Sequence, residues 1–212
     1  MHITRDILRA ALDLPVPPGL SGGYGARAAA VAVPIRLGVE PCATLVLRSS
    51  ALREHAGEVG FPGGKQDPED PDLEATALRE LEEEVALGPD DVEVLGRLRA
   101  VSVITGRYLI HPFVALLREG HRPRITSPEI ARLLDVPLLP WITGAAIHYG
   151  VRTEWRGSES IMPHFELDGC ILYGASACIF HELLQRLAVM LGRELPAPLL
   201  QEELPWGDRY NV

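Results

Sequence analysis

Hydrophobic residues along this chain follow two different spacings, which predict strands in some stretches and helices in others. Aliphatic and β-branched runs bounded by Gly and Pro are typical of strands. Such runs occupy residues 28–35, 43–47, 92–98, 101–104 and 108–117. Apolar residues repeated every three or four positions are typical of helices. This spacing predicts helices over residues 3–14 and 175–191, and a short helix opened by Ser127-Pro128-Glu129 with Ile130, Leu133 and Leu134 on its apolar side.

The segments between these elements carry residues that favour turns. Proline and glycine are frequent in residues 15–25, which predicts a linker. Residues 148–160 are polar and predict a hairpin or a loop. Pro112 cannot donate a ladder hydrogen bond, so it predicts an edge or a bulge within its strand.

A further helix, dense in carboxylates, follows a Gly-rich turn in residues 63–87. At about 100° per residue, Glu80, Glu83 and Glu84 share one face, and Arg79 lies at its edge. Ala77, Leu78, Leu81 and Val85 fill a separate arc, which predicts a packing stripe. The helix is capped by Asp70 or Asp72, and Gly88-Pro89 predicts its end.

The acidic face has two interpretations. Glu80 and Glu84 are like charges four residues apart, which destabilises an isolated helix. A divalent cation would reverse this cost, and oxygen ligands suit Mg²⁺ or Mn²⁺. The alternative is a solvated acidic face without a ligand. Asp70 also has two interpretations, because its position suits a helix cap as well as a catalytic role.

The spacing of these residues resembles a Nudix box, G-x5-E-x7-R-E-U-x-E-E-x-G-U, in which U is apolar. Three departures are Asp70 in place of the first glutamate, eight residues instead of seven before Arg79, and Ala86 in place of the late glycine. The coenzyme A-type form of the box, GGxxDxxDxxxxxTALREAxEE, fits better, with only Leu81 differing from its alanine. The residues that match this form include Asp67, Asp70, Thr76, Ala77, Leu78, Arg79 and Glu80.

The stretch before the box, RSSALREHAGEVGFPGG at residues 48–64, resembles the RSxxLRxHxGxVxFPGG motif of the same subfamily. It gathers Arg48, Arg53 and His55 in an otherwise acidic chain. Guanidinium groups suit phosphate oxygens, and coenzyme A carries a 3′-phosphate beyond its diphosphate. These three residues are therefore candidates for substrate binding. The alternatives are surface salt bridges for the arginines and a packed or capping role for His55.

Two later segments also resemble the subfamily. Glu129 precedes a stretch similar to VxxVPL, which makes it a candidate metal ligand or general base; the alternative is a first-turn glutamate favoured by the helix dipole. Residues 171–177 are similar to a stretch containing IWGATA, from which Tyr173 and Ser176 depart. Tyr173 either packs in the core or stacks on adenine.

The resemblance implies the Nudix fold, an α/β/α sandwich around a mixed β-sheet. It implies a metal-dependent pyrophosphatase, a hydrolase that cleaves coenzyme A or its derivatives to 3′,5′-ADP and 4′-phosphopantetheine. In that assignment Gly64, Glu80, Glu83 and Glu84 bind Mg²⁺ or Mn²⁺. Arg79 positions a glutamate, and the general base is Glu80, Glu84 or Glu129. The alternatives are a pyrophosphatase for ADP-ribose, NADH or nucleoside triphosphates, and a non-catalytic module that senses a nucleotide.

Composition narrows the partners. The chain has 212 residues, a net charge of −9 and a pI of about 5.3, which disfavours nucleic acid and anionic membranes. Cys42, Cys170 and Cys178 are odd in number and lack metal-type spacing, so reduced thiols in a cytoplasmic protein are expected. No signal peptide or long apolar span is seen. We expect an N-terminal helix and linker (1–26), a Nudix domain (27–191) and a tail (192–212) that either is loose or joins a homodimer contact.

Overall fold

The first sheet is centred on two long parallel strands. The computed structural model describes residues 1–15, 26–103, 105–155 and 158–207. β1 (Arg27–Arg36) runs parallel to β7 (Tyr108–Leu117), with Ala32 opposite Phe113. The neighbours are antiparallel, in the order β3-β2-β1-β7-β5, with β4 on β1, β6 on β7 and β8 on β2. These strands are β2 (Cys42–Arg48), β3 (Val59–Gly60), β4 (Gly63–Lys65), β5 (Val92–Arg97), β6 (Val101–Ser102) and β8 (Ile130–Pro137).

The alternation of side chains in β1 assigns each face of this sheet to a different helix layer. Ala30 and Ala32 point to the core cluster that contains Ala77 and Leu81 of α2 (Leu73–Val85). Their small side chains let α2 lie close to the strand. Val31 and Val33 point to the opposite cluster, which is shared with the other helices. β1 is therefore buried on both faces, which accounts for its unbroken apolar sequence.

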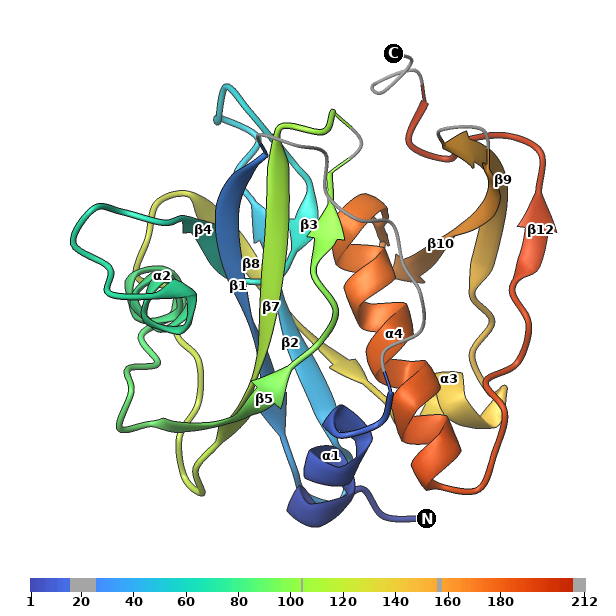
Figure 1. The fold of residues 1–212 in the computed structure, drawn as a ribbon, viewed down its shortest axis with the longest axis horizontal. Helices are drawn as coiled ribbons and strands as arrows, with labels where there is room; N and C mark the ends of the chain where they lie inside the picture. The colour runs from blue at the N-terminus through green and yellow to red at the C-terminus, as the bar shows by residue number, and fades with distance from the viewer. Residues whose placement is uncertain (16–25, 104, 156–157, 208–212) are drawn as a thin grey trace.

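The other face carries α1 (Arg5–Leu12), α3 (Leu139–Thr143) and α4 (Gly174–Met190). Figure 1 shows α4 between the first sheet and a second, smaller sheet. Arg186 of α4 is buried; it donates to the carbonyls of Ala11 and Leu14 and pairs with Glu182 at 2.8 Å, which ties α4 to the C-terminal end of α1. The predicted α/β/α sandwich with a mixed sheet is confirmed.

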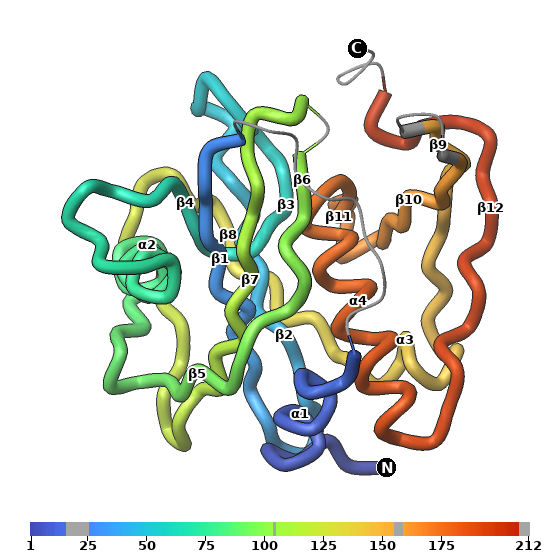
Figure 2. Tube along the Cα trace, in the orientation of Figure 1, coloured from blue at the N-terminus to red at the C-terminus, as the bar shows by residue number. Residues whose placement is uncertain are grey.

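The second sheet has the order β11-β10-β9-β12. Residues 148–160, predicted as a hairpin or loop, contribute to the antiparallel pair of β9 and β10. The tail is not loose over its described part, because β12 pairs in parallel with β9, and Figure 2 shows the two running together. The strands are β9 (Tyr149–Trp155), β10 (Ser158–Leu167), β11 (Cys170–Leu172) and β12 (Leu199–Gln201).

Two helix predictions need correction. The segment after Ser127 is not a helix but β8, which pairs with β2 and places Val46 opposite Leu133. Ser-Pro-Glu is a helix-start pattern, yet pairing with β2 outweighs it here. The acidic helix ends at Val85, before the predicted Gly88-Pro89, because Ala86 adopts a left-handed φ of 54°. This is the position at which the Nudix box has glycine.

Pro112 lies within a central strand instead of an edge. It is opposite Val31 on one side, and on the other side it falls between the β5 and β6 pairings. Its carbonyl accepts from the Leu98 amide at 3.0 Å. The predicted linker falls, apart from Pro15, outside the described residues. None of the described helices is long and apolar enough to cross a membrane.

Candidate active site

Two glycines allow β4 to pair with β1 and also to contact the acidic helix. Gly63 has a φ of 158°, and a Cβ there would overlap the backbone of Ala30 and Val31. A Cβ on Gly64 would overlap the Glu80 carboxylate. The glycine pair therefore lets β4 pair with β1 while Glu80 lies directly against the Gly64 backbone.

Arg79 donates hydrogen bonds to several acceptors around the contact between Gly64 and Glu80. Its Nε and Nη2 donate to the two Asp70 carboxylate oxygens, each at 3.1 Å, and its Nη1 donates to Glu80 Oε1 at 2.9 Å. Nη2 also donates to the Lys65 carbonyl at 3.2 Å. The Arg79 guanidinium lowers the pKa of Asp70 to about 2. Asp72 caps the helix by accepting from the Ala75 amide at 2.8 Å. Asp70 is therefore not the helix cap, and its carboxylate binds Arg79 instead.

Glu84 is the buried carboxylate of the cluster. Its Oε1 lies 3.4 Å from Arg48 Nη1, and its Oε2 has no hydrogen-bond partner among the described residues. Burial raises the pKa of Glu84 to about 7, although the Arg48 charge acts in the opposite direction. Burial also raises the pKa of Glu80. An ionised pair at Glu80 and Glu84 therefore needs positive charge beside it.

Arg48 connects Glu84 to a segment distant in sequence. Its Nη2 lies 2.7 Å from Glu129 Oε2, and the Glu129 carbonyl accepts from the Ser49 amide at 2.7 Å. Glu129 and Glu84 are thus held by one guanidinium at the end of β2. Pairing of β2 with β8 produces this arrangement, because Arg48 lies opposite Ile130.

The remaining sequence-predicted residues lie outside this cluster. The Glu83 side chain is 59% exposed, and among the described residues its carboxylate pairs with Arg79 alone, at 3.3 Å. His55 is held by Glu58 through a 2.8 Å contact, which raises the pKa of His55. Arg53 is exposed and has no ion pair or hydrogen bond with another described residue. The structure therefore brings together Gly64, Arg79, Glu80, Glu84, Arg48 and Glu129.

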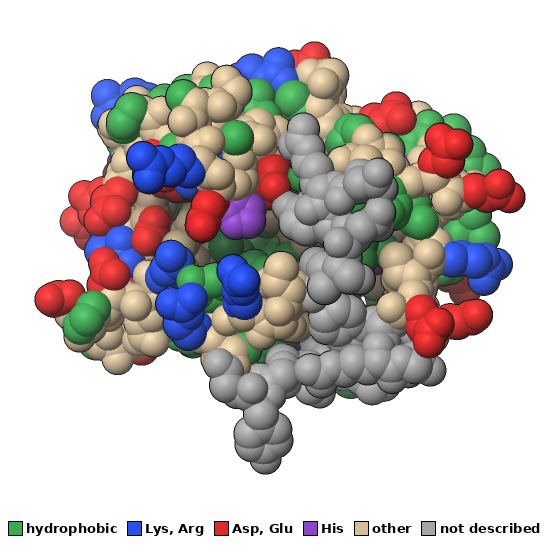
Figure 3. All heavy atoms as spheres, turned by 90° about the horizontal axis from the view of Figure 1, so that it is seen from above, with side chains coloured by type: hydrophobic (Ala, Val, Ile, Leu, Met, Phe, Trp, Pro, Cys, Tyr) green, Lys and Arg blue, Asp and Glu red, His purple; other side chains and the backbone are tan. Residues whose placement is uncertain are grey.

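Sequence reasoning missed a basic cluster beside the site. The Arg27 guanidinium lies 4.9 Å from the Tyr108 ring centroid, and Lys65 Nζ lies 5.7 Å from it. Within the described part of the chain, neither cation has a carboxylate partner. Figure 3 views the molecule from above and shows basic side chains gathered beside acidic ones on that face. Only the strand register brings Arg27, Lys65 and Tyr108 together, so no local sequence signal could have found them.

The donor set of the acidic cluster fits a hard divalent cation. It offers carboxylate oxygens from Glu80 and Glu84, the adjoining Gly64 backbone and an unpartnered buried oxygen on Glu84. Among the described residues, no three Asp, Glu, His or Cys side chains are already gathered as a metal cage. The reason is that Glu80 is turned to Arg79 and Glu84 to Arg48.

Comparisons with known proteins identify the family of the chain. Residues 26–146 match the model of the NUDIX domain. An uncharacterized Nudix hydrolase NudL from Photorhabdus laumondii is 38% identical over 178 residues, covering 84% of this chain and 94% of that protein. A NudL from Yersinia pestis is 34% identical over 194 residues, covering 89% and 96%.

Solved Nudix structures are similar at lower identity. The NUDIX domain of Shewanella oneidensis NrtR complexed with ADP ribose has a TM-score of 0.45 and 24% identity, covering 57% of this chain and 79% of that one. A MutT/nudix family protein from Enterococcus faecalis has a TM-score of 0.49 and 13% identity, covering 82% and 71%.

Proposed function

The chain belongs to the Nudix hydrolase family and is a pyrophosphatase for nucleoside diphosphate derivatives, and from this premise we propose that its substrate is coenzyme A or a derivative of it. Hydrolysis of the diphosphate bond gives 3′,5′-ADP and 4′-phosphopantetheine, or its acyl form. The observation that carries the proposal is the cluster of Glu80 and Glu84 against the glycine turn, flanked by the basic stretch that begins at Arg48.

We assign metal binding to Glu80, Glu83, Glu84 and the carbonyl of Gly64. Nudix hydrolases require divalent metals, and the oxygen-only donor set favours Mg²⁺ or Mn²⁺. The chemistry that such an ion supplies when bound is neutralisation of diphosphate oxygens and a lowered pKa for bound water. Glu83 is exposed and must turn from Arg79 toward the other two glutamates to contribute.

The protein residues hold the carboxylates in place for this chemistry. Asp70 fixes the Arg79 guanidinium with two hydrogen bonds, and Arg79 in turn fixes Glu80. Arg48 holds Glu129 beside Glu84. The proton of the attacking water passes to one of Glu80, Glu84 or Glu129, which are held by these two arginines.

Three basic side chains without a carboxylate partner among the described residues favour coenzyme A over the rival substrates. ADP-ribose, NADH and nucleoside triphosphates lack its 3′-phosphate. Arg53, Arg27 and Lys65 have no carboxylate partner among the described residues, so their charges are available to an additional phosphate. The alignments with the two NudL relatives cover nearly the whole length of those proteins.

Arg53→Ala tests this preference. A hydrogen bond to a charged group contributes about 1.5–3 kcal/mol, so kcat/KM for coenzyme A should fall roughly 10- to 100-fold. Turnover of dephospho-coenzyme A, which lacks the 3′-phosphate, should change much less. Arg152→Ala is the matched control, because Arg152 is also exposed but lies on the second sheet. Equal losses on both substrates would refute the phosphate rationale.

A further inference from the structure

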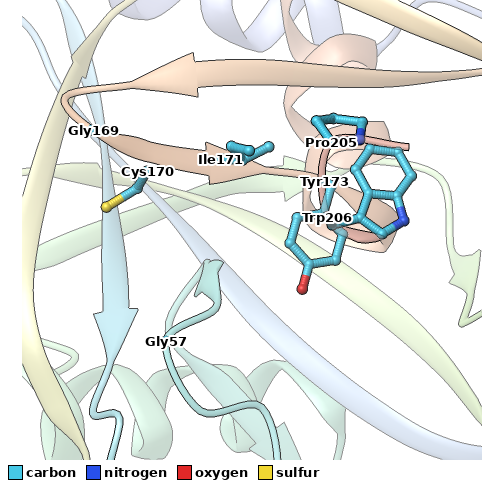
Figure 4. A pocket seen from close by; sticks show the side chains of 7 residues that line it. All are labelled: Gly57, Gly169, Cys170, Ile171, Tyr173, Pro205 and Trp206. Atoms are coloured by element: carbon cyan, nitrogen blue, oxygen red, sulfur yellow. The ribbon is translucent and has the colours of Figure 1, made fainter. Parts of the chain in front are cut away.

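A pocket of about 270 Å³ lies where the C-terminal tail meets the first turn of α4. Figure 4 shows the rings of Tyr173 and Trp206 together at one end and Gly57 approaching from the turn before β3. None of the lining side chains is charged or carries an amide. The lining residues are Gly57, Gly169, Cys170, Ile171, Tyr173, Pro205 and Trp206.

The tail places Trp206 through several specific contacts. Its ring stacks on Tyr173, with centroids 5.0 Å apart and planes 11° apart. It meets the buried His164 edge-on at 5.4 Å, and His164 Nε2 lies 2.9 Å from Gln201 Oε1. Because β12 is also paired with β9, the ring is held at a fixed place by residues far apart in sequence.

The pocket and the acidic cluster flank the same strands. A Cβ on Gly60 of β3 would lie 3.2 Å from Ser176 Oγ, only three residues after Tyr173. Arg132 of β8 donates to Cys170 Sγ at 3.1 Å, and Arg132 lies opposite Leu47, the residue before Arg48. A nucleotide whose diphosphate lies at Glu80 and Glu84 therefore has this pocket as a neighbouring region for one of its ends.

We propose that Tyr173 and Trp206 form a stacking platform for the purine base of the nucleoside diphosphate substrate, with Trp206 a specificity-determining residue supplied by the tail. The inference rests on the proposed function and names where the base binds. An uncharged aromatic lining suits a flat base and offers nothing to a phosphate. The pocket is slightly smaller than those that hold whole drug-sized ligands, as expected for a subsite that takes one part of a substrate. The pantetheine arm, which carries two amides, would find no side-chain amide or charge here to pair with them.

The test compares AMP with ribose 5-phosphate, which differs only in lacking the base. Calorimetry should show that Trp206→Ala weakens AMP binding at least about fivefold, because stacking on an aromatic ring contributes about that much or more. Binding of ribose 5-phosphate should not change. AMP should quench tryptophan fluorescence in the wild type, and Trp206→Phe should keep the affinity for AMP but lose this quenching.

Leu199→Ala is the control for disturbance of the tail, because Leu199 is exposed on β12 and does not line the pocket. It should leave the affinity for AMP unchanged. Equal AMP affinity in wild type and Trp206→Ala, or equal losses for AMP and ribose 5-phosphate, would overturn the inference. Turnover of coenzyme A by the wild type is measured separately. Absence of this turnover would reject coenzyme A as the substrate. AMP binding that depends on the base and on Trp206 would still support the stacking platform.

Discussion

Gly64→Ala separates the geometry of the carboxylate cluster from the stability of the fold. A Cβ at residue 64 would overlap the Glu80 carboxylate, so this side chain must rotate away from the β4 backbone. Gly64 does not have the positive φ of its neighbour Gly63, and alanine is therefore compatible with the backbone. The group that moves is the flexible end of a glutamate, which costs the fold little.

The expected magnitudes differ strongly between folding and catalysis. Replacing glycine at a compatible position stabilises a protein by about 0.4–1 kcal/mol through the unfolded state. Loss of the contact between Arg79 and Glu80 removes about 0–1 kcal/mol, since the Arg79 side chain is partly exposed. These two terms nearly cancel, so the free energy of unfolding should stay within about 1 kcal/mol of wild type. Displacement of a catalytic group by about 1 Å costs on the order of 100-fold in rate.

The assay pairs urea unfolding with initial rates of diphosphate hydrolysis in Mg²⁺ or Mn²⁺. Gly88→Ala is the matched control, because its Cβ would lie 3.4 Å from the carboxylate of Glu82, another glutamate of the same helix that points away from the site. The control should retain its rate. If Gly64→Ala is folded and hydrolyses substrate within about threefold of wild type, the placement of Glu80 against Gly64 is not required for catalysis.

Two further predictions concern titratable groups. Glu84→Gln should lower turnover by at least about 100-fold with little change in Tm, as should Glu83→Gln, because both remove negative charge needed by the cation; near-wild-type metal-dependent rates in both would reject the site. Burial lowers the pKa of His181 to about 4 and also lowers that of His148. Because the unfolded chain then binds more protons between about pH 6.5 and 4, stability falls as the pH drops through this window, by up to about 3 kcal/mol for His181. Thermal melts from pH 7.5 to 4.5 should show that stability declines less steeply for His181→Leu than for wild type. Parallel declines of the two proteins would contradict the burial argument. The raised pKa of Glu84 acts in the opposite direction in both proteins, so subtracting one stability curve from the other removes its contribution.

Features confined to one helix were predictable from the sequence. The angular spacing in residues 73–85 correctly placed Ala77, Leu81 and Val85 in the core. Glu84 proved to be buried and Glu83 exposed, because the helix is rotated so that Glu84 lies against β4 and Arg48. Local periodicity gives neighbours on a helix surface but not how deeply each one is buried.

Features that depend on the pairing of distant segments were harder to predict from the sequence. The contact from Arg48 to Glu129 spans 81 residues, and the sequence indicated Glu129 only by resemblance while predicting a helix where β8 forms. The cluster of Arg27, Lys65 and Tyr108 depends on the register of three strands. Trp206 reaches Tyr173 only because β12 joins the second sheet, and nothing in the tail's composition signals this pairing.

Product analysis tests the central claim most directly. Purified protein with Mg²⁺ or Mn²⁺ is incubated with coenzyme A, ADP-ribose, NADH and deoxynucleoside triphosphates, and the products are separated by chromatography. The proposed function predicts that 3′,5′-ADP and 4′-phosphopantetheine are released from coenzyme A in preference to products from the other substrates, and that Glu84→Gln releases neither. Preferred cleavage of another substrate would contradict the assignment to coenzyme A, and metal-dependent cleavage that persists in Glu84→Gln would contradict the site itself.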